Sequence, residues 1–381
     1  MATETDTLVI GAGPAGLAVG AALRRAGVPF VMLDRGARVG DSWRGHYDRL
    51  HLHTPKALSA LPFRPFPRAY PRYPSRAQVV AYLEDYARAF DLRPAFGREV
   101  RRCVRERDAW TVATNDGDYR AERVVVATGY NRVPNEPRWP GQETFPGPVL
   151  HSRAYTSGEG FRDRRVLVVG FGNSGAEIAL DLAEHGARCT VAVRGPVNVI
   201  PRELLGVPIL AFSLALRPLP PRVADAMNAL TLRLAIGDLA PLGLTKRRDG
   251  PFVEIAEGRQ IPVIDVGTLA RIRRGEIAVR GGVEAFDGDA VRFAGGARER
   301  FDAVVLATGF TTGLPAFLPD HAASVLDARG APRAHGREAG APGLYFCGFD
   351  LRATGMLRQI AIEAVAIARD VASRRPRSAS R

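Results

Sequence analysis

The sequence predicts an α/β fold with two Rossmann-like dinucleotide-binding domains in one chain, the second inserted in the first. Two observations predict this fold. A strand, a glycine-rich turn, a helix and a second strand follow one another within residues 7–34, and the same order recurs within 165–194. Each copy is followed further along the chain by the tripeptide Ala-Thr-Gly, at 127–129 and at 307–309. An internal repeat of this kind indicates two similar units, and 381 residues are enough for both.

Apolar runs and turn residues predict the individual elements. In the first copy, the apolar strand Thr7–Ile10 precedes a helix over Leu17–Ala26, and a strand over Pro29–Asp34 follows. A second helix is expected from Ser75, because Ser75 and Gln78 form a capping-box pattern. The same criteria predict a helix over 176–185 and strands near 98–105, 109–114, 119–127, 165–169, 188–194, 276–280, 290–293 and 301–307.

The composition excludes several classes of protein. Hydrophobic residues make up 46% of the chain and charged residues 24%, which is typical of a folded protein. The 3 cysteines form no Cys-x-x-Cys pair, so neither a disulfide framework nor a zinc site is expected, and a reducing, cytoplasmic location is favoured. The longest apolar run, 207–216, is too short for a transmembrane helix, which needs about 20 residues. The polar N-terminus does not resemble a signal peptide.

The net charge of +13 comes almost entirely from arginine. Only Lys56 and Lys246 are lysines, so 53 − 2 = 51 basic residues are arginines. Such a bias indicates a GC-rich genome, and hence a bacterial source, more than selection for a basic surface. The arginines are spread along the chain without a clustered stripe, so nucleic acid is not an expected partner. A basic average suits anionic small molecules such as nucleotide cofactors.

The first glycine-rich turn reads Gly11-Ala12-Gly13-Pro14-Ala15-Gly16 and lies between a predicted strand and a predicted helix. Gly11 permits the tight turn, Gly13 lets a pyrophosphate approach the backbone, and Gly16 lets helix and strand pack closely. Asp34 ends the second strand, where a carboxylate accepts hydrogen bonds from the ribose hydroxyls of an adenosine. The alternative is a chance glycine turn in a parallel sheet, which the context and Asp34 disfavour.

The second glycine-rich turn reads Gly170-Phe171-Gly172-Asn173-Ser174-Gly175 and has the same context. Its second strand ends in Arg194 rather than in an acid. An acid would repel the 2′-phosphate of NADP(H), whereas an arginine pairs with it. The sequence therefore favours NADP(H) over NAD(H). In an arginine-rich protein, the alternative is an arginine that merely ends a strand.

Two dinucleotide turns in one chain imply electron transfer between two cofactors, of which FAD and NADPH are the usual pair. The segment 343–348 is expected to return as a strand to the first sheet, and 354–372 to form a closing helix whose N-terminus faces the flavin. The predicted domains are a first part of the FAD-binding domain over 1–148, an NADPH-binding domain over 149–311 and a returning FAD-binding segment over 312–381.

One stretch decides between the kinds of flavoprotein. Residues 145–155 match the pattern Phe-x-Gly-x-x-x-His-x-x-x-Tyr, with His151 and Tyr155 at its last two positions. In this pattern and over nearly its whole length, the chain resembles the flavin-containing monooxygenases, and among them most closely the YUCCA-type enzymes. The segments that carry the resemblance are Ser42-Trp43, Tyr47–Leu50, His53–Lys56, Leu61–Phe63, Tyr73-Pro74, Val126–Gly129, Arg165–Gly175, Pro201–Glu203, Asp265–Gly267 and Gly343–Phe349.

The resemblance implies a reaction. In this family NADPH reduces FAD, the reduced flavin takes up O2 to give a C4a-(hydro)peroxyflavin, and one oxygen atom is transferred to a small organic substrate. The expected chemistry is N- or S-oxygenation, or oxidative decarboxylation of an α-keto acid such as indole-3-pyruvate. Two alternatives remain open: a flavin oxidoreductase that passes electrons to another acceptor, and a non-catalytic flavin-binding module. A homodimer is one expected assembly.

The resemblance also assigns residues. His53 stands where many flavin-containing monooxygenases have an asparagine over the flavin, and it is either the catalytic residue or a packing histidine. His151 is expected to satisfy backbone groups at a hinge, and Asp350 either reaches the flavin ribityl chain or belongs to a surface loop. The other cofactor-binding residues implied are Arg35, Ser42, Trp43, Val100, Thr128, Gly129, Gly348 and Leu357 for FAD, and Ser152 and Tyr155 for NADPH.

Two features have no place in this scheme. Val223, Met227, Leu230 and Leu234 recur at helical spacing within the apolar stretch 207–236. Ordinary core packing is the default expectation, and a cover over the active site or a membrane-docking surface are the alternatives. The run Lys246-Arg247-Arg248 is expected to be a solvated charge run, with a phosphate or acidic substrate as the alternative ligand.

Overall fold

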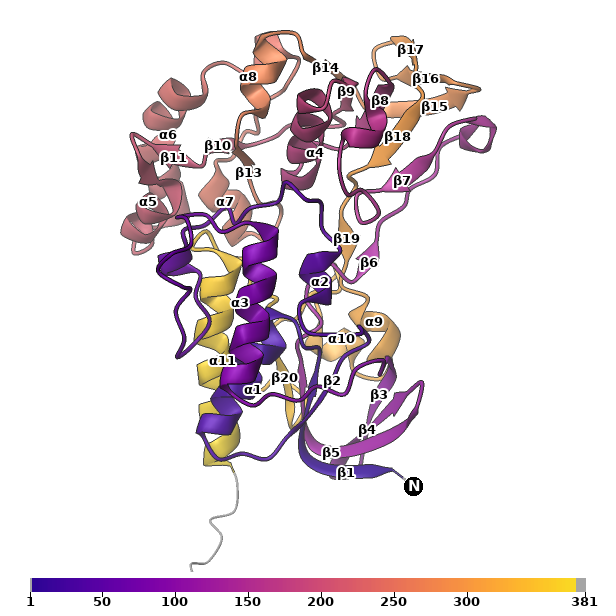
Figure 1. Ribbon diagram of the computed structural model, residues 1–381. Coiled ribbons are helices and arrows are strands. Elements are labelled where there is room, and N and C mark those ends of the chain that lie inside the picture. Colours follow the sequence, from indigo (N-terminus) through magenta and orange to yellow (C-terminus); the bar gives the residue numbers. More distant parts are fainter. Residues whose placement is uncertain (1, 375–381) are drawn as a thin grey trace, which may run out of the picture.

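The computed structural model describes residues 2–374. Figure 1 shows two α/β halves, one containing β1, β5, α1 and α11 and the other containing β8, β18 and α4. Two short antiparallel strands, β6 (Val133–Pro134) and β19 (Phe310–Thr311), pair where the chain passes between the halves. The fold is therefore mixed α/β, with each half built on its own sheet.

The first sheet has the strand order β2-β1-β5, and the returning strand β20 pairs with β5. These pairings are parallel, and Val126 of β5 stands opposite Ile10 and Phe346. The early part of β5 pairs antiparallel with β4, which pairs with β3. The strands are β1 (Thr3–Ile10), β2 (Val31–Leu33), β3 (Val100–Glu106), β4 (Ala109–Thr114), β5 (Gly117–Val126) and β20 (Leu344–Phe346).

Helices α1, α3 and α11 form one core with this sheet, to which they contribute buried side chains such as Leu17, Tyr86 and Ile367. Ser75 caps α3 through the predicted capping box with Gln78. The helices of this half are α1 (Pro14–Arg25), α2 (Asp41–Arg44), α3 (Arg76–Ala89), α9 (Leu314–Phe317), α10 (Ala322–Val325) and α11 (Met356–Ser373).

The second sheet has the order β14-β9-β8-β18-β7, and every pairing is parallel. Helix α4 packs on it, and a small antiparallel sheet, β15-β16-β17, belongs to the same half. The elements are β7 (Val149–His151), β8 (Arg165–Val169), α4 (Asn173–Glu184), β9 (Arg188–Ala192), α8 (Thr268–Arg273), β14 (Ile277–Arg280), β15 (Val283–Asp287), β16 (Ala290–Phe293), β17 (Arg298–Arg300) and β18 (Ala303–Leu306).

Between β9 and α8 the chain forms a helical insertion, which closes with the parallel pair β10 and β13. Figure 1 shows the insertion at one edge of the molecule, beside the N-terminal part of α11. Its elements are β10 (Val199–Pro201), β11 (Glu203–Leu204), β12 (Val207–Pro208), α5 (Ile209–Leu216), α6 (Pro221–Ile236), α7 (Pro251–Ala256) and β13 (Val263–Asp265). Single 3₁₀ turns occur at Lys56–Leu58, Gln142–Thr144, Glu159–Phe161 and Ala240–Leu242.

The expected strands and helices are present, with shifted ends. The first strand begins at Thr3 rather than Thr7, because its polar start pairs with β5 as far as Tyr119. Helix α1 begins at Pro14, whose fixed φ suits the first helical position. Strand β9 ends at Ala192, so Arg194 lies two residues beyond the strand that it was expected to end.

The expectation of core packing for the apolar stripe of α6 is wrong. Val223, Met227, Leu230 and Leu234 are 45%, 60%, 67% and 78% exposed. The helix packs through its opposite face, where Ala224 and Ile236 are buried. Helical spacing identified the stripe, but both faces of α6 carry apolar residues, and the spacing alone does not decide which face turns inward.

The basic run at 246–248 is only partly solvated. Lys246 and Arg248 are exposed, as expected. Arg247 is half-buried, and its guanidinium binds the buried carboxylate of Glu254 at 3.0 Å. Arg247 therefore holds α7 within the insertion.

Candidate active site

The first glycine turn connects β1 to α1 at the carboxyl ends of the parallel strands. Gly11 has φ +108°, and a Cβ there would lie 2.5 Å from the carbonyl oxygen of Ala127. A Cβ on Gly16 would collide with the backbone of Gly11, so both positions require glycine. A Cβ on Gly13 would meet only the hydroxyl of Ser42, at 3.6 Å. No side chain caps the N-terminus of α1, so its first N–H groups are available to an anion.

The carboxylate of Asp34 fixes the conformation of the first glycine turn through hydrogen bonds. Its Oδ2 accepts a hydrogen bond from the backbone N–H of Ala12 at 2.5 Å, and its Oδ1 accepts one from Gly36 at 2.6 Å. The carboxylate therefore has a fixed orientation at the end of β2, beside the open side of the turn. Carboxylate oxygens have lone pairs beyond these two bonds, so the site retains acceptor capacity for ribose hydroxyls.

The second glycine turn has nearly the same backbone as the first. Gly170 has φ +109°, and a Cβ there would lie 2.5 Å from the carbonyl oxygen of Ala307. A Cβ on Gly175 would collide with Gly170, whereas one on Gly172 would meet nothing within 4 Å. The N-terminus of α4 also lacks a side-chain cap. Arg194 is exposed near this turn, where the second half has no equivalent of the fixed Asp34.

The side chain of Asn173 ties the second turn to the insertion. Its Nδ2 donates to the carbonyl oxygen of Pro262 at 3.3 Å, and its Oδ1 accepts from the N–H of Ile264 at 2.8 Å. These bonds hold β13 against the N-terminus of α4. The insertion and the second turn are thus one connected unit.

The two halves meet at a pair of side chains that join them directly. His53, from the loop after α2, lies with its Nε2 against the carboxylate of Glu177 on α4, and Glu177 is buried. Tyr47 lies beside this pair, and its pKa is raised well above the usual value by burial and by the charge of Glu177. The Nδ1 of His53 has no protein partner among residues 2–374, and His53 lines the pocket described next.

A pocket of about 270 Å³ lies between the first half and the insertion. Most of its lining is apolar and comes from the insertion and the start of α11, including Ile209, Phe212, Leu232, Phe252 and Leu357. His53 and Arg352 are the charged or titratable side chains in the lining, and Asn173 from the second turn also contributes. The pocket is therefore an apolar chamber with one permanent cation.

The return segment carries a second group of polar side chains next to Arg352. Asp350 is buried and accepts hydrogen bonds from the Arg352 Nε, at 2.8 and 2.9 Å, and from Gln359 at 3.0 Å. Its burial disfavours the surface-loop alternative. Gly348 donates its N–H to Glu363 at 2.8 Å, and burial together with the charge of Asp350 raises the pKa of Glu363 to about 7.

Residues 145–155, which carry the pattern, form a linker between the halves, and the side chain of His151 in this linker bonds to two backbone groups. The Nε2 of His151 bonds the carbonyl oxygen of Gly309 at 3.0 Å, and its Nδ1 accepts the N–H of Arg153 at 3.1 Å. The prediction that His151 satisfies backbone groups is thus confirmed. Tyr155 is buried and donates its hydroxyl proton to Asp181 on α4 at 2.6 Å, so its ring is fixed by a protein carboxylate.

The remaining predicted residues lie around the first turn or on the linker. Thr128 and Gly129 follow β5 directly beside Gly11, and the Thr128 hydroxyl is buried without a partner among the described residues. Trp43 packs against the core of the first half. Their cofactor contacts stay predictions, as do those of Arg35, which donates to the Arg132 carbonyl oxygen, of Val100 at the start of β3, and of the buried Ser152.

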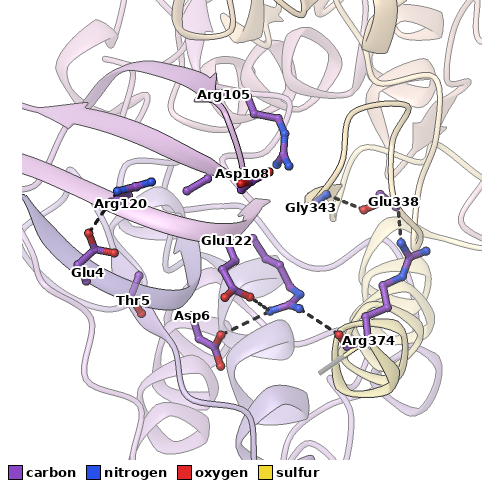
Figure 2. Close-up of a pocket in the computed structure, with 12 residues that line it drawn as sticks. Glu4, Thr5, Asp6, Arg105, Asp108, Arg120, Glu122, Glu338, Gly343 and Arg374 are labelled. Atoms are coloured by element: carbon purple, nitrogen blue, oxygen red, sulfur yellow. Dashed lines mark hydrogen bonds and ion pairs between the residues drawn. The ribbon is translucent and has the colours of Figure 1, made fainter. Parts of the chain in front are cut away.

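A larger cavity, of about 810 Å³, lies at the opposite end of the first sheet (Figure 2). Arginines and acids line it, and they pair with one another: Arg123 with Glu122 at 2.9 Å and Arg374 with Glu338 at 2.6 Å. Because ligands of parallel α/β sheets bind at the carboxyl ends of the strands, this cavity is not the active site.

Sequence reasoning missed several residues of the site: Tyr47, Glu177, Asp181, Arg352 and Glu363. A signal for two of them was present. The internal repeat aligns Glu177 and Asp181 with Ala18 and Ala22 of α1, so each is an acid on a helix face that is apolar in the other copy. Buried acids need partners, which would have indicated polar contacts at both positions, and the contact of Glu177 is the one that crosses between the halves.

Comparisons with known proteins agree with this arrangement. The family described as pyridine nucleotide-disulphide oxidoreductase matches residues 8–202. The rice (Oryza sativa subsp. japonica) protein indole-3-pyruvate monooxygenase YUCCA4 is 39% identical over 96% of this chain and 87% of its own length. Indole-3-pyruvate monooxygenase YUCCA6 of Arabidopsis thaliana is 40% identical over 83% of this chain and 78% of its own length.

Solved structures share the fold. A flavin-containing monooxygenase from Stenotrophomonas maltophilia superposes with a TM-score of 0.73 at 25% identity, over 97% of this chain and 99% of that chain. Cyclohexanone monooxygenase from Rhodococcus sp. Phi1, bound to NADP+, gives 0.73 at 21% identity over 98% of this chain and 85% of its own, and this likeness concerns the fold alone.

Proposed function

The chain belongs to the pyridine nucleotide-disulphide oxidoreductase family and, within it, to the YUCCA-type flavin-dependent monooxygenases, and we propose that its substrate is an apolar 2-oxo acid. The enzyme uses FAD and NADPH. The proposed reaction consumes one 2-oxo acid, one O2, one NADPH and one proton, and releases the acid shortened by one carbon, CO2, NADP+ and water. The apolar pocket with a single arginine is the observation that carries the choice of substrate.

The first turn fits FAD. Gly13 leaves open space at the uncapped N-terminus of α1, Asp34 has a fixed carboxylate beside it, and the Thr128 hydroxyl is buried without a protein partner. A pyrophosphate, a ribose and a further polar atom would satisfy these three features. We assign residues 2–148 and 312–374 of the described chain to this FAD-binding unit.

The second turn fits NADPH. Gly172 leaves open space at the uncapped N-terminus of α4, and the exposed Arg194 would pair with a 2′-phosphate. Residues 149–311 would form this unit. When bound, NADPH supplies two electrons and reduced FAD activates O2. Everything else in the reaction depends on how the protein orients, protects and protonates the reactants.

His53 is the proposed proton carrier of the pocket. Glu177 accepts the hydrogen bond of its Nε2, and Nδ1 has no partner among residues 2–374, so Nδ1 is the atom that would give or take a proton. Glu177 is a positioning residue: its buried carboxylate fixes the ring of His53. Because the two residues come from different halves, the pair exists only while the halves are docked.

Arg352 is the proposed partner of the substrate carboxylate. Asp350 accepts the hydrogen bonds of its Nε, and the two Nη groups, which have no partner among residues 2–374, would bind a carboxylate at the pocket. The apolar walls would receive the side chain of the acid and exclude water. The 2-oxo group would then lie between Arg352 and His53.

An isotope experiment on the purified holoenzyme tests the proposal. Under ¹⁸O2, with NADPH and 2-oxo acids bearing aromatic or branched side chains, we expect one ¹⁸O atom in the shortened acid and one CO2 per NADPH. Arg352→Gln should raise the KM of the acid about 10- to 100-fold, because a charged hydrogen bond contributes about 1.5–3 kcal/mol. The control is Arg369→Gln, an exposed arginine of α11.

Two results would contradict the proposal. Faster turnover of a neutral amine or sulfide than of any 2-oxo acid would replace decarboxylation by heteroatom oxygenation. NADPH oxidation that releases only hydrogen peroxide with every acid, while an added quinone or dye is rapidly reduced, would favour the electron-transfer alternative.

A further inference from the structure

The outer surface of the insertion carries apolar side chains that nothing in the described chain covers. Val223, Met227, Leu230 and Leu234 form one stripe along α6, at spacings of 4, 3 and 4 residues, and all four are exposed. Leu205, at the tip of the β11–β12 hairpin, is 97% exposed. Figure 1 places α6, α5 and β11 together at one edge of the molecule.

The backbone conformation of the hairpin keeps the side chain of Leu205 in solvent. Its φ is +49°, a left-handed conformation that leucine rarely adopts, and Gly206 follows it with φ +76°. Arg72 fixes the hairpin by donating to the carbonyl oxygen of Gly206 at 2.7 Å and to Glu203 at 2.9 Å. An apolar side chain held fully in solvent by a fixed hairpin suits contact with something outside the chain.

The charged residues beside the stripe indicate the chemistry of the partner that would bind there. Arg222 and Arg233 are exposed on α6, three helical turns apart, and Arg217 is exposed at the end of α5. The one acid of α6, Asp225, points inward and accepts the N–H groups of Phe252 and Val253 at 3.0 and 2.9 Å. The exposed face of α6 is thus apolar along its centre and basic along one side.

A second copy of the chain fits this face poorly. In an antiparallel pair of α6 helices related by a two-fold axis, the basic sides would meet, and Arg222 of one copy would approach Arg233 of the other. In a parallel pair, each basic side would meet the side containing Thr231, which has no carboxylate. Either arrangement leaves the arginines without an opposite charge on the exposed face of the facing α6 helix.

We propose that α6 and the β11–β12 hairpin dock the enzyme on an anionic lipid surface. The apolar stripe and Leu205 would enter the boundary between headgroups and acyl chains, and the arginines would contact lipid phosphates. Within residues 2–374 no helix is long and apolar enough to cross a bilayer, so the contact would be peripheral. The inner face of α6, through Asn228 and Leu232, lines the pocket, so docking would bring the lipid surface against its outer wall.

The experiment uses the full-length holoenzyme and two kinds of vesicle, phosphatidylcholine alone and phosphatidylcholine mixed equally with phosphatidylglycerol. Co-sedimentation should detect binding to the mixed vesicles and little to phosphatidylcholine alone. Arg222→Gln with Arg233→Gln should weaken binding about 30-fold, because each basic residue near an anionic surface contributes about 1 kcal/mol. Leu230→Glu with Leu234→Glu should abolish it.

Two kinds of control show whether a loss of vesicle binding is specific to this surface. Ile362→Glu replaces an exposed apolar residue of α11 and should bind vesicles as the parent does. Flavin content and the melting temperature show that each variant is folded. Failure of the parent to bind mixed vesicles would overturn the proposal. So would a dimer in sedimentation velocity that Leu230→Glu with Leu234→Glu dissociates, because the face would then belong to a second copy.

Discussion

The two glycine turns have almost the same backbone and opposite chemistry around it. Gly11 and Gly170 adopt φ of +108° and +109°, and each packs against the alanine of an Ala-Thr-Gly tripeptide. Beside the first turn Asp34 accepts two backbone hydrogen bonds, and beside the second Arg194 is exposed. The same fold thus offers a fixed acceptor in one half and an exposed cation in the other, and we propose that this difference lets one architecture select two different nucleotides.

The helices that follow the turns differ in the same way. Helix α1 presents Ala18 and Ala22 to the core, whereas α4 presents the buried acids Glu177 and Asp181 at the aligned positions. Glu177 holds His53 of the first half and Asp181 holds Tyr155 of the linker. The first turn is therefore built on an apolar core, and the second is attached to the rest of the molecule through specific polar contacts.

The largest expected effect comes from breaking the contact that joins the halves. Glu177→Gln should lower the rate of substrate oxygenation about 100-fold or more, the usual contribution of a positioned acid–base group. Reduction of the flavin by NADPH should change little.

His53→Gln should have a similar effect, and the double variant should be no worse than either single one, because the two residues act as a unit. Glu184→Gln is the matched control, since Glu184 lies on the same helix and pairs with Arg49 at the surface. Additive losses in the double variant would show that Glu177 does not act through His53.

The second-largest expected effect is on NADPH binding, and it follows from the contrast between Asp34 and Arg194. Arg194→Ala should weaken NADPH binding about 10- to 100-fold and leave NADH binding unchanged, because a charged hydrogen bond contributes about 1.5–3 kcal/mol. Binding can be followed as the concentration dependence of anaerobic flavin reduction. Arg188→Ala, which changes an exposed arginine at the start of β9, is the control. Equal losses with NADPH and NADH would remove Arg194 from the 2′-phosphate site.

A smaller effect concerns the acid behind the first turn. Burial raises the pKa of Glu363 from 4.5 to about 7, so the folded state binds its proton more tightly than the unfolded state does. The free energy of unfolding should therefore fall as pH rises from about 5 to 7, by on the order of 3 kcal/mol from this group. In Glu363→Gln, this part of the pH dependence should be absent from denaturant titrations. An unchanged slope would contradict a raised pKa.

The sequence predicted the backbone of the site better than its side-chain contacts. The glycines at 11, 16, 170 and 175 are required by local geometry that any glycine-rich strand–helix turn imposes, so their pattern was sufficient. The pair of His53 and Glu177 spans 124 residues, and no local period connects them. The stripe of α6 was found by its spacing, but its direction depends on tertiary packing and was predicted wrongly.

The most direct test of two turns holding two cofactors is a pair of alanine variants. Gly13 and Gly172 have room for a methyl group and φ of −74° and −90°, so alanine fits the protein at both and projects only into the proposed phosphate space. Flavin content and NADPH affinity are measured for each variant. We expect Gly13→Ala to lose FAD, and Gly172→Ala to keep FAD while binding NADPH at least tenfold more weakly. Loss of flavin from Gly172→Ala, with normal flavin in Gly13→Ala, would contradict the assignment.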